Sequence, residues 1–271
     1  MSPSLFIGML NKEKIQSREM LIMAESKNSG VLIFEGMTVG FCPGDLTISI
    51  DEEGKPQSSA ILSTSYNVLP LWLRVAHDNV ALAKAAYETI ADQWNDVPDN
   101  QRALLLAELT PAIQTFVACG IAYDAFYEQI KPFASISEND VAAWKKNRTS
   151  RATQISEVIR RVYKLNGESF RKVKNVIKDT IRLRDLAVHP SHKIERAINR
   201  PDIPVGLDWR FCTYRYENAS ICYKNIVDVL TYLRNQASPE EKANEIIENT
   251  FKALLQMGIV SDRPAPSHTP G

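Results

Sequence analysis

Hydrophobic residues recur every three or four positions from about residue 70 onward, a spacing typical of amphipathic helices. The first predicted helix has a hydrophobic side made of Val75, Leu82, Ala86, Ile90 and Trp94. A second helix is predicted to begin near Asp99, a suitable N-cap residue. Because proline lacks a backbone N–H and clashes with the preceding turn, Pro111 is expected to kink or divide this helix.

A capping-box pattern opens the next helical stretch. Ser137 is followed three residues later by Asp140, and the helix is expected to continue towards Leu165. Gly167 interrupts the pattern. The helix that follows has one hydrophobic side, made of Phe170, Val173, Ile177, Ile181 and Leu186.

The C-terminal part of the chain contains a loop and two more predicted helices. Residues 190–209 are rich in proline, and helices are predicted over 212–236 and 239–257. Helices with mostly short connections predict a mainly α fold, an up-and-down bundle over residues 71–260. The tail, residues 261–271, is predicted to be disordered.

The N-terminal residues 1–70 differ from the rest, because short β-rich runs alternate with glycine and proline. Strands of a small antiparallel sheet are predicted over 31–35, 38–41, 46–50 and 60–64, after a short helix over 13–26. A sheet of this size is marginal alone, so it is expected to pack on the bundle.

Composition is that of a soluble globular protein, with 44% hydrophobic and 24% charged residues. The four cysteines form no C-x-x-C pair, which argues against a disulfide framework or a zinc site and favours reduced core thiols. No signal peptide is evident, and no apolar run is judged long enough to span a membrane. The protein is therefore expected to be cytoplasmic, without a membrane partner.

The net charge of zero conceals a strong asymmetry. Residues 145–184 contain 13 Lys or Arg and three acids, a local charge of +10, whereas residues 1–144 sum to −9 and residues 185–271 to −1. A local excess of this size favours a polyanionic partner such as RNA. The alternative is that the segment is simply a solvated helix face.

Several chemistries lack their sequence patterns. None of the four histidines forms an H-x-x-x-H or H-E-x-x-H pair, so no metal site is expected. Glycine-rich nucleotide-binding patterns and the G-x-S-x-G elbow are also absent, so no cofactor is expected.

The stretch RLRDLAVHPSHK closes the helix after Gly167 and carries the candidate chemistry. Asp185 and His189 are four residues apart, so the carboxylate is placed to accept a hydrogen bond from the imidazole. On a regular helix Arg184 lies about 140° from His189, so the two meet only at an irregular helix end or across two copies of the chain. Alternatively, Arg and His simply stabilise the carbonyl end of the helix.

The sequence RDLAVH resembles the R-[polar]-x-x-x-H signature of the HEPN superfamily, with Arg184 as the arginine, Asp185 as the polar residue and His189 as the histidine. The resemblance implies an all-α bundle and a metal-independent endoribonuclease that acts as a homodimer. His189 would transfer protons, Arg184 would hold the scissile phosphate, and Asp185 would orient the imidazole.

The basic segment would then supply contacts to the RNA backbone. The residues expected to bind nucleic acid are Arg160, Arg161, Lys164, Arg171, Lys174, Lys178 and Arg182. Other members of the superfamily are interaction modules, so a non-catalytic role, in which the motif stabilises a helix end or a subunit contact, remains the alternative. A protein partner is compatible with both hypotheses, but the sequence does not identify one.

Overall fold

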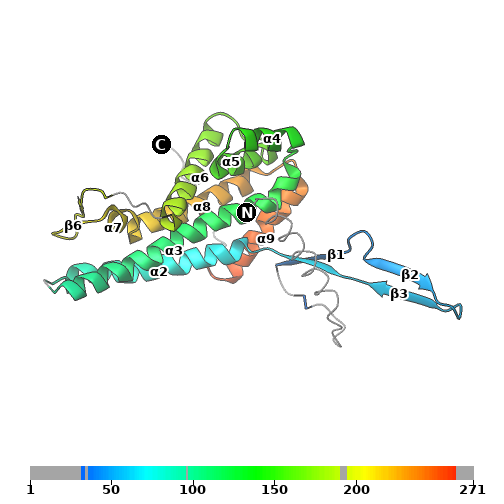
Figure 1. Ribbon diagram of the computed structural model, residues 1–271, viewed down its shortest axis with the longest axis horizontal. Helices are drawn as coiled ribbons and strands as arrows, with labels where there is room; N and C mark the ends of the chain where they lie inside the picture. Colours follow the sequence, from blue (N-terminus) through cyan, green and yellow to red (C-terminus); the bar gives the residue numbers. More distant parts are fainter. Residues whose placement is uncertain (1–31, 34–35, 96, 190–193, 261–271) are drawn as a thin grey trace, which may run out of the picture. The chain divides into compact units, whose positions relative to one another are not determined.

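A computed structural model shows a mainly α protein (Figure 1). It describes residues 32–33, 36–95, 97–189 and 194–260. The helix predicted over 13–26 and the tail predicted to be disordered over 261–271 lie outside the described residues. Two compact units divide between Ser65 and Tyr66.

The N-terminal unit consists of short strands in two-stranded sheets. Its strands are β1 (Met37–Gly40), β2 (Leu46–Ile50), β3 (Pro56–Ala60) and β4 (Ser63–Tyr66), with β1 paired to β4 and β2 antiparallel to β3. The strands predicted over 38–41 and 46–50 are confirmed to within a residue. The strand predicted over 60–64 is wrong, because Ile61 and Leu62 join β3 to β4. Of the strand predicted over 31–35, residues 32 and 33 are described, and neither is in a strand.

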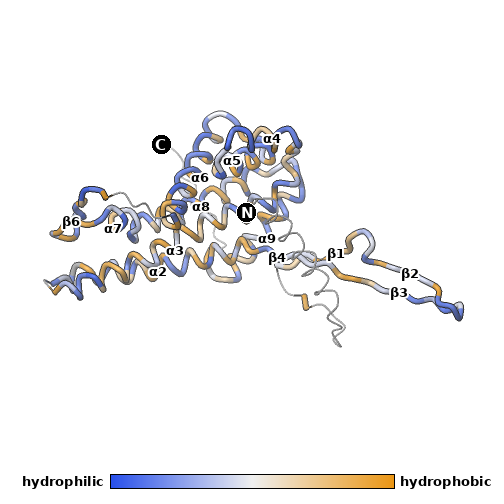
Figure 2. Tube along the Cα trace, in the orientation of Figure 1, coloured by the Kyte–Doolittle hydropathy of each residue, from blue (hydrophilic) through white to orange (hydrophobic). Residues whose placement is uncertain are grey.

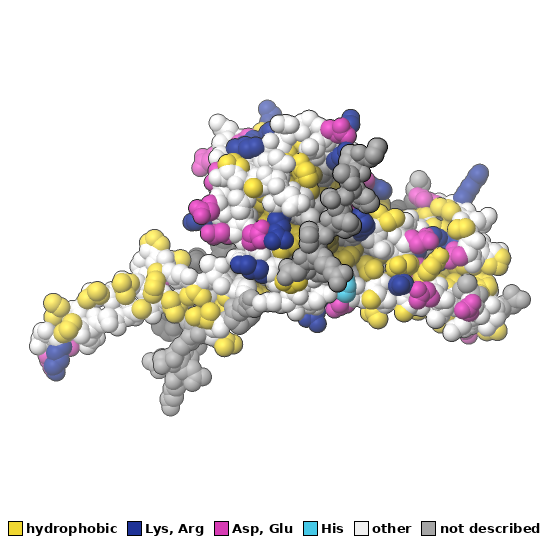
Figure 3. All heavy atoms as spheres, turned by 180° about the vertical axis from the view of Figure 1, so that it is seen from behind, with side chains coloured by type: hydrophobic (Ala, Val, Ile, Leu, Met, Phe, Trp, Pro, Cys, Tyr) yellow, Lys and Arg dark blue, Asp and Glu magenta, His cyan; other side chains and the backbone are white. Residues whose placement is uncertain are grey.

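The β2–β3 hairpin is amphipathic. Its turn is held by the Asp51 carboxylate, which accepts hydrogen bonds from the backbone N–H groups of Glu53 and Lys55. The bond from Lys55 is the main reason that the pKa of Asp51 lies below its usual value. Leu46, Ile48 and Ile50 alternate along β2 and are exposed. Hydrophobic side chains are visible along the hairpin at the left of Figure 3.

The helical unit is built around α3 (Pro98–Ile130). The other helices in the described part of the chain are α2 (Leu69–Gln93), η1 (Lys131–Phe133), α4 (Glu138–Lys146), α5 (Arg151–Val162), α6 (Gly167–Val188), α7 (Trp209–Thr213), α8 (Tyr216–Gln236) and α9 (Glu241–Gln256). Between α6 and α7, the short strand β5 (Ile198–Asn199) pairs with β6 (Gly206–Leu207). α3 packs against α2, α5, α6 and α8, so it is the centre of the helical bundle (Figure 1).

α3 runs through Pro111 without a break, so of the two expected effects of this proline, a kink or a division of the helix, division does not occur. Proline removes one hydrogen bond, but buried residues lie on both sides of it, including Leu105, Ala112 and Phe116. Burial of these side chains in the bundle offsets the lost hydrogen bond.

By length and composition Pro98–Phe133 is also a candidate membrane span, because its most apolar 18-residue window has a mean hydropathy of 1.6. Within the structure, 56% of its most apolar window is buried against other helices. The core helix of a bundle passes the same test, so this property alone decides nothing about a membrane.

The helix expected to run from Ser137 towards Leu165 is two helices. The capping box is confirmed: the Ser137 hydroxyl accepts from the Asp140 N–H at 3.1 Å, and the Asp140 carboxylate accepts from the Ser137 N–H at 2.9 Å. The chain then leaves the helix at Arg148, which has a left-handed φ of 50°. Ser150 caps the new helix, α5, by accepting from the Thr153 N–H.

Hydrophobic and hydrophilic residues alternate along the helices (Figure 2), but the predicted hydrophobic faces are confirmed only in part. In α6 the prediction is confirmed, because Val173, Ile177 and Ile181 are buried. In α2 the predicted face included Leu82, which is 62% exposed. The buried positions of α2 are Leu69, Leu73, Ala76, Ala83 and Ile90. The buried face of α2 therefore includes Ala83 and not its neighbour Leu82. The observed face is rotated about the helix axis from the predicted one by an amount that periodicity alone does not resolve.

Two of the four cysteines are core residues. Cys119 on α3 and Cys222 on α8 are buried free thiols, and their mutual hydrogen bond, together with burial, raises the pKa of Cys119. The expectation of core thiols was wrong for Cys42, which is exposed, and for Cys212, which is partly exposed.

Candidate functional site

α6 carries a row of cations on a face adjacent to its buried side. Arg171, Lys174, Lys178 and Arg182 are spaced three, four and four residues apart. On a helix with 3.6 residues per turn they span about 80° of the circumference and about 17 Å of the axis. Lys174 is half-buried and the other three are exposed. We call these four residues the α6 basic stripe.

His189 continues the line of the stripe at the end of α6. It is the C-cap residue, and its backbone N–H donates to the Asp185 carbonyl oxygen at 2.9 Å. Its imidazole is exposed and makes no hydrogen bond to any residue that the structure describes. The ring is therefore open to solvent at the end of a basic helix face.

Arg184 points the other way, towards α3. Its Nη1 donates to Asp124 Oδ2 at 2.5 Å, while Nε and Nη2 donate to Asp185 Oδ1 at 3.0 and 2.8 Å. The side chain is only 16% exposed. In the described part of the chain, the carboxylate expected to orient His189 thus accepts from Arg184 instead.

The Asp124 carboxylate joins two helices to α3, because its second oxygen accepts from Arg151 Nε at 2.6 Å. The Arg151 guanidinium also donates to Glu128 at 3.0 Å and lies 4.0 Å from the centre of the Tyr127 ring. Asp124 is 60 residues from Arg184 in the sequence, and no local pattern signals this contact.

The remaining predicted cations differ in their partners. Arg160 donates to Glu157 at 2.7 and 2.8 Å, and Arg161 donates to both Glu157 and Asp140. The Arg161 guanidinium, followed by hydrogen bonds from Ser137, holds the pKa of Asp140 well below its usual value. Lys164, Arg171 and Lys178 make no ion pair with any described residue, and Arg182 lies 4.0 Å from Asp179.

The net positive charge around residues 145–184 in the folded protein is therefore lower than the +10 counted along the chain. Asp124, Glu128 and Asp140 come from outside residues 145–184 and pair with three arginines inside them. The exposed cations of this segment lie partly on α6 and partly before it. Those on α6 are Arg171, Lys172, Lys178 and Arg182, and those before it are Lys145, Lys146, Arg148 and Lys164.

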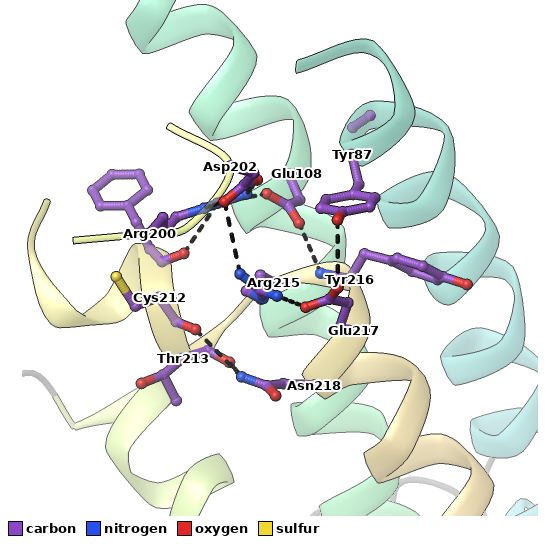
Figure 4. A network of polar contacts seen from close by, with 12 residues as sticks. Tyr87, Glu108, Arg200, Asp202, Cys212, Thr213, Arg215, Tyr216, Glu217 and Asn218 are labelled. Carbon is purple, nitrogen blue, oxygen red and sulfur yellow. Dashed lines mark hydrogen bonds and ion pairs between the residues drawn. The ribbon is translucent and has the colours of Figure 1, made fainter. Parts of the chain in front are cut away.

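A buried ion pair anchors the segment that follows His189. Arg200 donates to Glu108 on α3 at 2.7 Å and to Asp202 at 2.6 Å, and the side chains of Arg200 and Glu108 are 2% and 1% exposed. Glu108 also accepts from the Tyr216 N–H at 2.9 Å, and Arg215 lies 3.8 Å from Asp202 (Figure 4).

These contacts tie residues 194–209 to α3 and to the start of α8. No local sequence pattern indicates the pairing of Arg200 with Glu108, because these two residues are 92 positions apart. Residues 190–193, including His192, lie outside the described part of the chain.

No group of three potential metal-ligating side chains occurs among the described residues. Comparisons with models of known protein families, with curated proteins and with solved structures found no match to this chain.

Proposed function

We propose that this chain is an RNA-binding protein of the HEPN-like kind, and that the RNA backbone lies along the α6 basic stripe. The observation that carries the proposal is the alignment of four cations with His189 on one face of α6. Three of the four are exposed, and the carboxylate nearest to His189 in the sequence, Asp185, is already paired with Arg184. The stripe therefore presents positive charge that a phosphate backbone would neutralise with release of counterions.

The stronger form of the proposal is metal-independent RNA cleavage by a homodimer. His189 would transfer the proton of an RNA 2′-hydroxyl, and two copies of the chain would place two motifs at one cleft. Arg184 would then have to contact the scissile phosphate with the N–H groups that Asp124 and Asp185 leave free, or exchange one of these partners.

The second candidate is a non-catalytic HEPN-like interaction module. The contacts of Arg184 favour it, because a guanidinium held by two carboxylates and 16% exposed fixes the end of α6 against α3. In this case the R-[polar]-x-x-x-H motif is a structural element of the bundle, and the stripe binds RNA or another polyanion without cleaving it.

RNA binding is tested with the double variant Lys178→Gln/Arg182→Gln and a control, Lys172→Gln. Lys172 is also on α6 and 75% exposed, but lies outside the stripe. For single-stranded RNA, the slope of log affinity against log salt should fall by about 0.7 for each lost phosphate contact. We expect a reduced slope in the double variant and a wild-type slope in the control. Equal affinity and slope in all three proteins would overturn the proposal.

Cleavage is tested on a mixed RNA pool in the presence of EDTA. If the stronger form holds, the wild type cleaves and His189→Ala does not, with unchanged melting temperature because His189 is exposed. If the wild type binds RNA but leaves it intact, and Arg184→Ala lowers only the melting temperature, the non-catalytic candidate holds.

A further inference from the structure

An open pocket of about 420 Å³ lies where α5 ends and α6 begins. Its lining consists of Phe133, Ala134, Ser135, Arg160, Arg161, Lys164, Leu165 and Asn166. The volume lies within the range of small-molecule sites, about 300–1,000 Å³. Every charged residue in this lining is a cation.

The two arginines of the pocket are held in fixed orientations. Arg161 donates two hydrogen bonds to Asp140 at 3.0 and 2.9 Å and a third to Glu157 at 2.8 Å. Both Arg160 bonds also go to Glu157. Neither carboxylate lines the pocket, so the acids orient the guanidinium groups from outside it.

Lys164 adds a charge with no ion pair among the described residues, so Arg160, Arg161 and Lys164 with their two acidic partners keep a net charge of +1. Asn166, the N-cap of the 22-residue helix α6, makes no side-chain capping hydrogen bond. The backbone N–H groups of the first turn of α6 add to the positive potential of the three cations, while the one acid in that turn, Glu168, is paired with Lys172 at 2.9 Å.

We infer that this pocket binds a phosphate monoester, the doubly charged group at the end of an RNA strand or on a free mononucleotide. Two oriented guanidinium groups and an ammonium group favour a terminal phosphate over the singly charged diesters of the chain interior. Phe133 and Leu165 form an apolar part of the lining, which suits the base or sugar attached to such a phosphate.

The pocket is connected to the α6 basic stripe through one aromatic ring. The Arg160 guanidinium and the Lys174 ammonium lie 5.9 and 5.8 Å from the centre of the Phe170 ring. A strand whose end occupies the pocket would therefore meet the stripe at Lys174. If the bound phosphate is the end of an RNA strand, this inference rests on the proposed function. If it belongs to a free mononucleotide, the inference is independent of that function.

The probes are AMP, adenosine, and ten-nucleotide RNAs with a phosphate at the 5′ end, at the 3′ end or at neither. Lys164→Asn removes the pocket's unpaired charge, and asparagine tolerates the left-handed φ of 52° at this position. Lys172→Gln is the charge-matched control outside the pocket. Affinities are measured by titration calorimetry for AMP and by fluorescence anisotropy for RNA.

We expect AMP to bind more tightly than adenosine, and at least one phosphorylated RNA to bind about tenfold more tightly than the hydroxyl-ended RNA, as one charge-assisted contact provides. Lys164→Asn should remove both differences, and Lys172→Gln should keep them. An RNA difference without AMP binding identifies the strand end as the ligand.

Two outcomes separate this inference from the proposed function. AMP binding that is lost in Lys164→Asn, with no binding of any RNA, keeps the pocket and overturns RNA binding. Equal affinity for all three RNAs, together with equal affinity for AMP and adenosine, overturns the pocket even if the α6 basic stripe binds RNA.

Discussion

The side chain of Arg184 lies so close to Gly120 on α3 that a Cβ atom at residue 120 would be 2.5 Å from the Arg184 Cδ and 3.0 Å from its Cγ. Overpacking of this kind costs about 1–3 kcal/mol. Alanine is favoured over glycine in a helix by about 1 kcal/mol, which offsets part of the cost. We therefore expect Gly120→Ala to lower the free energy of unfolding, measured with urea.

The same substitution should lower the free energy of unfolding by less in an Arg184→Ala background than in the wild type. Alanine at residue 184 removes the Cγ and Cδ contacts but keeps its own Cβ, 3.0 Å from the new methyl group, so most but not all of the overpacking is relieved. If Gly120→Ala destabilises equally in both backgrounds, the contact between Gly120 and Arg184 is not the reason for its effect.

Asp124 should contribute more to stability than an exposed carboxylate of the same type. Asp124→Asn weakens charge-assisted hydrogen bonds to both Arg151 and Arg184, with an expected loss of about 1–3 kcal/mol. The control is Asp179→Asn, where the side chain is 68% exposed and the change should stay within about 0.5 kcal/mol. Similar losses in the two variants, measured by urea unfolding, would contradict the bridging role of Asp124.

The buried pair of Arg200 and Glu108 should be sensitive to loss of one partner. Arg200→Ala leaves the Glu108 carboxylate buried, which should cost about 3–5 kcal/mol. Arg196→Ala removes an exposed arginine from the same segment and should change stability by less than about 0.5 kcal/mol. The measurement is the free energy of unfolding. A loss below about 1 kcal/mol in Arg200→Ala would show that the pair is not formed in solution.

The same network predicts a pH dependence. Hydrogen bonding to Arg200 is the largest cause that lowers the pKa of Asp202 below its usual value of 3.8. A lowered pKa in the folded state means that the stabilisation is complete above the pKa of the unfolded chain and is lost as pH falls through the folded value. The stability difference between wild type and Asp202→Asn should therefore be constant near neutral pH and shrink below about pH 4.

Urea unfolding between pH 7 and pH 2.5 measures this difference. Asp179→Asn, at an exposed carboxylate, serves as the control and should show little change with pH. A difference between wild type and Asp202→Asn that grows as the pH falls would contradict the assignment.

The sequence by itself predicted the mainly α fold, the capping box at Ser137 and the buried face of α6. These features are local, because helical periodicity and capping depend on residues only three or four positions apart. The alignment of the α6 basic stripe with His189 follows from the same spacing. The sequence also predicted the charge excess, but not which of its arginines are paired.

Tertiary structure decided the pairing. Asp124 lies 60 residues from Arg184, and Glu108 lies 92 residues from Arg200, so only packing of α3 against the other helices brings these groups together. It also decided that α3 continues through Pro111, because burial on both sides offsets a locally unfavourable residue. Interactions between distant residues depend on the folded arrangement of helices, and no local pattern in the chain records them.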